Sequence, residues 1–256
     1  MKRFVLFVVA LSNAVAWAQV VHPDLKSGKE HVNRIVIMPV QAEIDKQSMK
    51  GGEPMTEQAR ELEKSLTPVI ADVLRKMNVT VDDTAFASAA FDKDPDFRYT
   101  TDDLQKKFDA ILGQLTRKPN DVRKGRFTLG DSVAKLGDLN ADALLFVRAS
   151  GSVLTGARKV WSFPLSYDRL RLRMALVDAR TGTVLYFAKQ TILKNVTKDP
   201  NNAKEDIQAL FKDFGKANKG KTLIKPEGRQ NVSWSIPIRE TSLVAHVLTL
   251  FTSVEV

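Results

Sequence analysis

One short acidic stretch has the spacing of an oxygen-ligand cation site. Its aspartates are Asp92, Asp94, Asp96 and Asp103. Ligands at alternate positions, followed by another carboxylate eleven residues after the first, are typical of calcium loops. Phe97 stands where such a loop needs glycine for its sharp turn. The stretch therefore leaves two interpretations open: a calcium site, or a solvated acidic loop that caps the next helix.

Two further motifs match the letters of catalytic or nucleotide-binding patterns. Residues 129–132 (LGDS) resemble the nucleophile block of GDSL-type hydrolases, and residues 215–222 (GKANKGKT) match the P-loop. The serine falls at a predicted helix start, and His246 lacks the acid three residues before it that such hydrolases need. A P-loop lies between a strand and a helix, whereas a predicted helix precedes this one and Pro226 follows it. We therefore expect neither a catalytic residue nor a nucleotide site here.

Three arginines alternate with apolar residues at the start of RLRLRMALVDARTGTVLYFAKQTIL (residues 169–193). Side chains two residues apart on a strand share a face, so Arg169, Arg171 and Arg173 should point to one side of it. Like charges placed this way repel each other, and an anionic partner would relieve the cost. The sequence therefore predicts a basic binding surface, with a merely solvated outer face as the alternative. No aromatic residues alternate with these arginines to stack on bases, which argues against nucleic acid.

The N-terminus has the three parts of a secretory signal peptide. A basic start (MKR) precedes the apolar run FVLFVVALSNAVA, and Ala16-Trp17-Ala18 offers a cleavage site. We expect cleavage near Ala18, a periplasmic or secreted mature protein without a transmembrane helix, and a polar linker over residues 19–32. An uncleaved anchor is the alternative. Removal of Lys2 and Arg3 lowers the formal charge from +9 to +7, which still favours anionic partners.

The absence of cysteine limits the chemistry of the chain. With no cysteine there is no disulfide, thiolate metal site, cysteine nucleophile or lipidation cysteine. The three histidines show no triad or metal-binding spacing. We expect a non-enzymatic protein without a cofactor.

The apolar pattern predicts alternating strands and helices after residue 33. Strands are expected at 34–41, 79–83 and 141–150, and helices at 56–77 (kinked near Pro68), 101–115, 128–137 and after 200, while residues 42–55 read as a loop. An antiparallel hairpin at about 162–193 turns at residues 179–182 (ARTG). The prediction is one α/β domain over residues 33–256, with a mixed sheet of about five strands flanked by helices.

These segments together resemble a known group of envelope domains. The strand RIVIMPV ending at Pro39, the passage LGDLNADALLFVRASGSV and the hairpin RLRMALVDARTGTVLYFAKQTI are similar to the α/β domain shared by CsgG, LpoB and the N-terminal domain of TolB. The resemblance covers roughly residues 33–195. It implies a sheet flanked by helices, no catalytic residues, and a role in envelope assembly through protein contacts. The chain lacks the lipid-anchor cysteine of the lipoprotein members and any propeller-like repeat.

Pattern and resemblance together give a functional prediction. We expect an exported, non-enzymatic protein that acts in cell-envelope biogenesis or secretion by binding a protein partner or an anionic surface, with homo-oligomerisation left open. A periplasmic hydrolase and a small-ligand or calcium-binding module are the alternatives. A hydrolase would require a deep polar pocket with an assembled catalytic group.

Overall fold

A mixed eight-stranded sheet forms the centre of the computed structural model, which describes residues 18–48, 51–86, 94–136, 139–154, 169–192 and 200–219. The strands are β1 (Ala18–Val21), β2 (Arg34–Ile37), β3 (Gln41–Ser48), β4 (Gly51–Pro54), β5 (Thr80–Asp82), β6 (Ala143–Leu154), β7 (Arg169–Asp178) and β8 (Val184–Ile192). The main strand order is β1-β8-β7-β6-β2-β5, and β3 pairs with both β4 and β6. The predicted α/β class is confirmed, although the sheet has more strands than the five expected.

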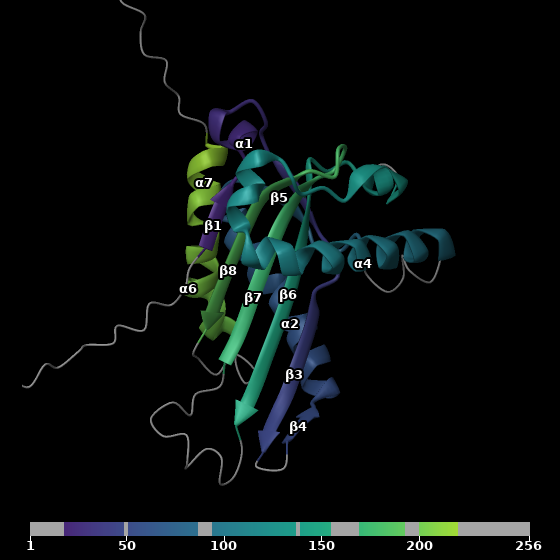
Figure 1. The fold of residues 1–256 in the computed structure, drawn as a ribbon, viewed down its shortest axis with the longest axis vertical. Coiled ribbons are helices and arrows are strands. Elements are labelled where there is room, and N and C mark those ends of the chain that lie inside the picture. The colour runs from purple at the N-terminus through teal and green to yellow at the C-terminus, as the bar shows by residue number, and fades with distance from the viewer. Residues whose placement is uncertain are drawn as a thin grey trace, which may run out of the picture. The chain divides into compact units, whose positions relative to one another are not determined.

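Two layers of helices cover the sheet (Figure 1). They are α1 (Pro23–Ser27), α2 (Thr56–Arg75), α4 (Pro95–Arg117), α6 (Lys204–Leu210) and α7 (Lys212–Asn218), with short 3-10 helices η1 (Pro119–Lys124), η2 (Gly130–Leu136) and η3 (Pro200–Ala203). The apolar residues of α1, α2, α6 and α7 pack on one face of the sheet. Those of α4, η1 and η2 pack on the other.

The segment after β2 differs from the sequence prediction. Pro39 ends the hydrogen-bonding run of β2, because proline has no N–H to donate. The chain then pairs again with β6 as β3, parallel to it, and β4 returns antiparallel to β3. The prediction of a loop over residues 42–55 was wrong, because these residues form β3 and β4. Their polar composition is that of a strand with one face exposed to solvent. Ile44 supplies the other face and is buried.

The segment predicted as a linker, residues 19–32, also carries structure. β1 pairs antiparallel with β8, with Gln19 opposite Ala188. His22 caps α1, and Leu25 of that helix is fully buried. Two apolar residues, Val20 and Leu25, therefore attach this segment to the two faces of the sheet. The predicted signal peptide spans residues 1–18, and of these only Ala18 lies within the described residues.

The sequence prediction misplaced the start of one helix and differs from the structure in the form of two others. α4 begins at Pro95 with Asp94 as its N-cap, whereas Thr101 lies inside the helix and donates its hydroxyl to the carbonyl of Phe97 at 2.8 Å. α2 is one continuous helix across Pro68, so this proline does not divide it into two helices. The expected helix over 128–137 is the 3-10 helix η2.

Candidate functional site

The alternation in β7 places its two kinds of side chain on opposite faces, as expected. The leucines and the methionine, Leu170, Leu172, Met174 and Leu176, are buried against the layer that contains α2. Arg169 and Arg171 are exposed on the other face, and Arg173 is partly buried. Neither Arg169 nor Arg171 makes a hydrogen bond or ion pair within the described part of the chain. The predicted basic surface therefore has two accessible guanidinium groups and a third at its inner edge.

This face of the sheet changes character along its strands. Near the β7–β8 turn, Ala175, Val177 and Phe187 pack beneath Leu104 and Phe108 of α4 and its neighbours. Figure 1 shows α4 crossing over the strands, with β3, β6 and β7 continuing beyond it. The same-face residues on these continuing strands are polar. We call this region the polar face; it comprises Gln41, Glu43, Asp45, Arg148, Ser150, Ser152, Arg169, Arg171, Arg173, Lys189 and Thr191.

A row of three cations crosses the inner edge of the polar face. Arg148, Arg173 and Lys189 are direct neighbours on β6, β7 and β8. Side chains paired in this way have Cβ atoms only about 4.5–5.5 Å apart, so three positive charges in register oppose folding unless they are compensated.

Helix α4 compensates the two outer members of this row. The Nε of Arg148 donates to Oδ1 of Asp109 at 2.6 Å, and its Nη2 donates to the carbonyl of Gln105 at 3.2 Å. Lys189 donates to the carbonyl of Thr116 at 2.9 Å, near the helix C-terminus where the macrodipole favours a cation. The central member of the row, Arg173, makes no hydrogen bond to α4 within the described residues, although the charge of Asp109 favours its charged form.

Arg173 has most of its donors unused. Its Nη2 donates to the Ser150 hydroxyl at 3.2 Å, whereas its Nε is buried and has no hydrogen-bond partner within the described residues. Burial lowers the pKa of the Arg173 guanidinium, and the charges of Arg148 and Arg171 act in the same direction, while Glu43 opposes them. No carboxylate of the described chain forms an ion pair with Arg173.

The opposite side of the polar face is acidic. Glu43 and Asp45 of β3 are exposed, and their register partners on β6 are Ser150 and Ser152. The serines therefore separate a carboxylate strip on β3 from the guanidinium strip on β7. The sequence pattern identified the arginines of β7 but not the acidic strip, because residues 42–55 were predicted as a loop.

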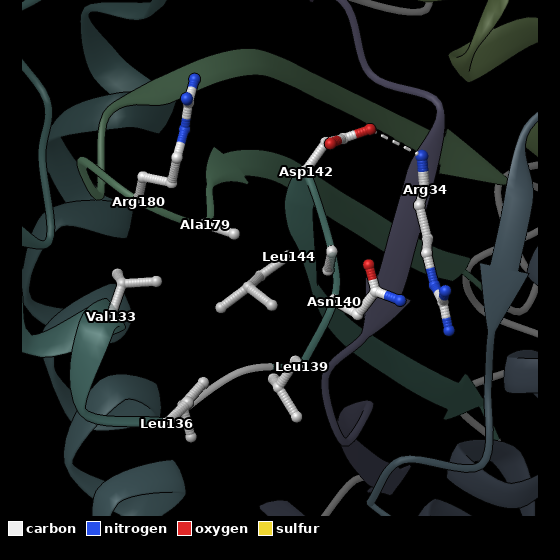
Figure 2. Close-up of a pocket in the computed structure, with 10 residues that line it drawn as sticks. Arg34, Val133, Leu136, Leu139, Asn140, Asp142, Leu144, Ala179 and Arg180 are labelled. Carbon is white, nitrogen blue, oxygen red and sulfur yellow. Dashed lines mark hydrogen bonds between the residues drawn. The ribbon is translucent and has the colours of Figure 1, made fainter.

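The pocket in Figure 2 contains one carboxylate and two guanidinium groups, those of Asp142, Arg34 and Arg180. It encloses about 320 Å³ at the end of the sheet next to the β7–β8 turn, and none of its lining residues carries a hydroxyl, thiol or imidazole. Its carboxylate, Asp142, accepts hydrogen bonds from the backbone N–H groups of Asn33 and Arg34 at 2.8 and 3.0 Å. Val133, Leu136 and Leu144 give it an apolar floor. Asp142 thus fixes the start of β2 rather than acting as a general base.

The GDSL-like serine is buried beside a lysine. Ser132 accepts a hydrogen bond from the Nζ of Lys107, whose charge is balanced by Asp103 at 2.8 Å. Lys107 and Asp103 are four residues apart on α4, the usual spacing of an ion pair on one helix face. The arrangement is therefore a structural ion pair with a hydrogen-bonded serine.

Of the predicted calcium residues, Asp94 and Asp103 lie apart on α4. Asp94 uses Oδ1 to accept from the backbone N–H groups of Asp96 and Phe97, both at 3.0 Å. Asp103 lies nine residues further along α4, about 13 Å away at 1.5 Å per residue. Asp92 lies outside the described residues, in which no group of three or more potential ligands is found. The helix-cap interpretation was the correct one for Asp94.

Only part of the P-loop match can be placed. Gly215 lies inside α7, preceded by α6 rather than by a strand. Gly220, Lys221 and Thr222 lie outside the described residues.

Across the described ranges, no helix combines the length and apolar character needed to span a bilayer.

Comparisons with known proteins give matches among solved structures only. No family model matches the chain, and no curated protein does. The PelC dodecamer of Paraburkholderia phytofirmans is 11% identical over 76% of this chain and 95% of its own, with a TM-score of 0.34. Lipoprotein GNA1162 of Neisseria meningitidis is 12% identical over 63% and 81%, with a TM-score of 0.31. The LpoB C-terminal domain of Salmonella enterica is 13% identical over 66% and 90%, with a TM-score of 0.29. LpoB is also one of the proteins that the sequence motifs resemble.

Proposed function

We propose that this chain is an exported, non-enzymatic protein that acts in cell-envelope biogenesis or secretion by binding a protein partner. The polar face is the contact surface. The leader-like N-terminus and the resemblance of residues 33–195 to envelope domains support the location and the role. The observation that carries the binding assignment is the uncovered part of the sheet, where Arg169 and Arg171 have no partner within the described chain.

The charge pattern of the polar face favours a protein over an anionic surface. An anionic membrane or polymer presents one sign of charge and would meet Glu43 and Asp45 as well as the arginines. A protein surface can present both signs, and such complementarity sets the orientation of a partner more than it sets the raw affinity. One partner protein can therefore place negative charges over the arginines of β7 and positive charges over the carboxylates of β3.

Crosslinking in intact cells tests this proposal. The triple variant Arg169→Ser/Arg171→Ser/Arg173→Ser should lose most of the crosslinked adduct that the unaltered chain forms, because it removes the whole guanidinium strip. The matched control is Arg60→Ser/Arg98→Ser/Arg123→Ser. These three arginines are exposed on α2, α4 and η1, so the control changes the net charge equally but leaves the polar face intact. Equal adduct in both variants would show that the contact surface lies elsewhere.

A further inference from the structure

The N–H donors of Arg171 and Arg173 could bind one small anion between them. A guanidinium group has five N–H donors in a planar fork. Arg173 donates one hydrogen bond within the described residues, and Arg171 donates none. The two side chains project from the same face two residues apart, so their bases are separated by about 6–7 Å.

Hydroxyl groups flank the two arginines. Ser150 and Thr191 are the register partners of Arg171 on β6 and β8. The Ser150 oxygen accepts from Arg173, which leaves its own hydrogen to donate. An oxyanion lying over Arg171 would therefore meet guanidinium and hydroxyl donors from three adjacent strands.

The local charges make such an anion favourable. Arg148 and Arg171 add positive potential around Arg173, and the charges of Glu43 and Asp109 offset it only by acting through space, because neither carboxylate forms an ion pair with Arg173. A charge-assisted contact would satisfy donors that are now unpaired, and hydrogen bonds of this type are about twice as strong as neutral ones.

We propose, on the basis of the function given above, that the partner protein places an aspartate or glutamate carboxylate between Arg171 and Arg173 and a lysine or arginine opposite Glu43 and Asp45. The two strips are two strands apart, which is about 10 Å at the usual strand spacing. A single partner segment can span that distance. A phosphate group fits the same guanidinium pair, but a phosphate polymer without cationic groups supplies no partner for the acidic strip.

Zero-length crosslinking with a carbodiimide gives a residue-level test. The reagent joins an amine to a carboxylate or phosphate that is in contact with it. The variant Arg171→Lys keeps the charge and puts an amine at the anchor; Arg60→Lys puts one at an exposed position on α2. Intact cells that produce each full-length variant are treated, and the adducts are mapped by mass spectrometry.

The expected product joins position 171 to an aspartate or glutamate of another protein, with several-fold more adduct than at position 60. The same protein should also carry a lysine joined to Glu43 or Asp45. A phosphoramidate at position 171, with a lysine of the partner protein still joined to Glu43 or Asp45, would overturn the carboxylate anchor while leaving the proposed protein contact intact. Adducts with a partner that map only to other faces would overturn both the anchor and the polar face as the contact surface. Absence of any adduct with another protein would count against both.

Discussion

Arg148 and Asp109 join β6 to the underside of α4, with Nε of the arginine 2.6 Å from Oδ1 of the aspartate. The Arg148 side chain is 8% exposed, whereas that of Asp109 is 48% exposed. The arginine is therefore the partner that cannot regain its solvation if the pair is broken. This asymmetry determines how the two residues should respond to substitution.

We expect Asp109→Ala to reduce the free energy of unfolding by about 1–3 kcal/mol, because it leaves a buried guanidinium without its carboxylate. The like charges of Arg173 and Arg148 then face each other across the strands without compensation. Urea denaturation at neutral pH measures the loss.

The double variant Arg148→Met/Asp109→Ala provides the control for this pair. Replacing a buried charge together with its partner by apolar groups is often nearly neutral. We therefore expect the double variant to recover most of the stability that Asp109→Ala loses. Equal losses in the single and double variants would show that packing around α4, rather than the charge, sets the cost.

The hairpin and the buried strands were predictable because their signals are local. Alternating Leu170 and Leu172 set the inward face of β7, and the ARTG turn set the position of β8, whatever the rest of the sheet does. β3 and β4 were not predictable in this way. Their residues are mostly polar, and the hairpin that they form joins the sheet only because β6 extends beyond β2 and pairs with β3.

The arginines of the polar face could be predicted from the sequence because their spacing is local, whereas its acidic residues could not. Arg169, Arg171 and Arg173 lie on one strand, so the period of two was enough to group them. Glu43 is close to Arg171 only through the parallel pairing of β3 with β6, which no local pattern encodes. The burial of Arg173 depends likewise on how far α4 extends over the sheet, and this distance is set by tertiary packing.

The turn between β7 and β8 gives a second prediction. Gly182 has a φ of +71°, and a Cβ added there would lie 2.5 Å from the carbonyl oxygen of Gly130. Gly182→Ala would force the backbones apart and should destabilise the fold by more than about 1–2 kcal/mol. Gly130→Ala is the matched variant, since Gly130 also has positive φ (+66°) but no atom within 4 Å of its added Cβ.

Thermal denaturation of the two glycine variants separates steric clash from backbone strain. Both substitutions pay for the left-handed conformation, so any additional fall in Tm at Gly182→Ala reports the close approach to Gly130. Identical Tm values would mean that the turn can move away from η2 without cost, contrary to the contact described here.

The start of α4 supplies a third prediction. Asp94 caps the helix through its Oδ1, so Asp94→Ala should lower the free energy of unfolding by about 1 kcal/mol, and Asp94→Asn should lower it much less because its amide oxygen also caps. Added calcium should leave the Tm of the unaltered chain unchanged. A rise in Tm with calcium that Asp94→Ala abolishes would restore the cation-site interpretation.

The buried phenol of Tyr186 gives a pH-dependent prediction. Its hydroxyl donates to the carbonyl of Leu210 and lies 3.1 Å from Oε1 of Gln19. Burial, with a smaller contribution from the charge of Asp213, raises the pKa of Tyr186 far above its ordinary value of 10. Below pH 10 the phenol is neutral in both the folded and the unfolded chain, and its contribution to stability is constant. Above pH 10 only the unfolded chain ionises, so that contribution falls as the pH rises towards the folded-state pKa.

Tyr186→Phe isolates this contribution from the other groups that titrate in alkali. At pH 7 the variant should be less stable by about 1 kcal/mol, because the carbonyl of Leu210 loses its donor. Above pH 10 the unaltered chain should lose up to about 1.4 kcal/mol more per pH unit than the variant, so the gap between them closes and then reverses. Urea denaturation of both chains at pH 7, 9, 10 and 11 measures the difference. Parallel curves would mean that the phenol ionises equally easily in both states and is therefore not sealed from water between β8 and α6.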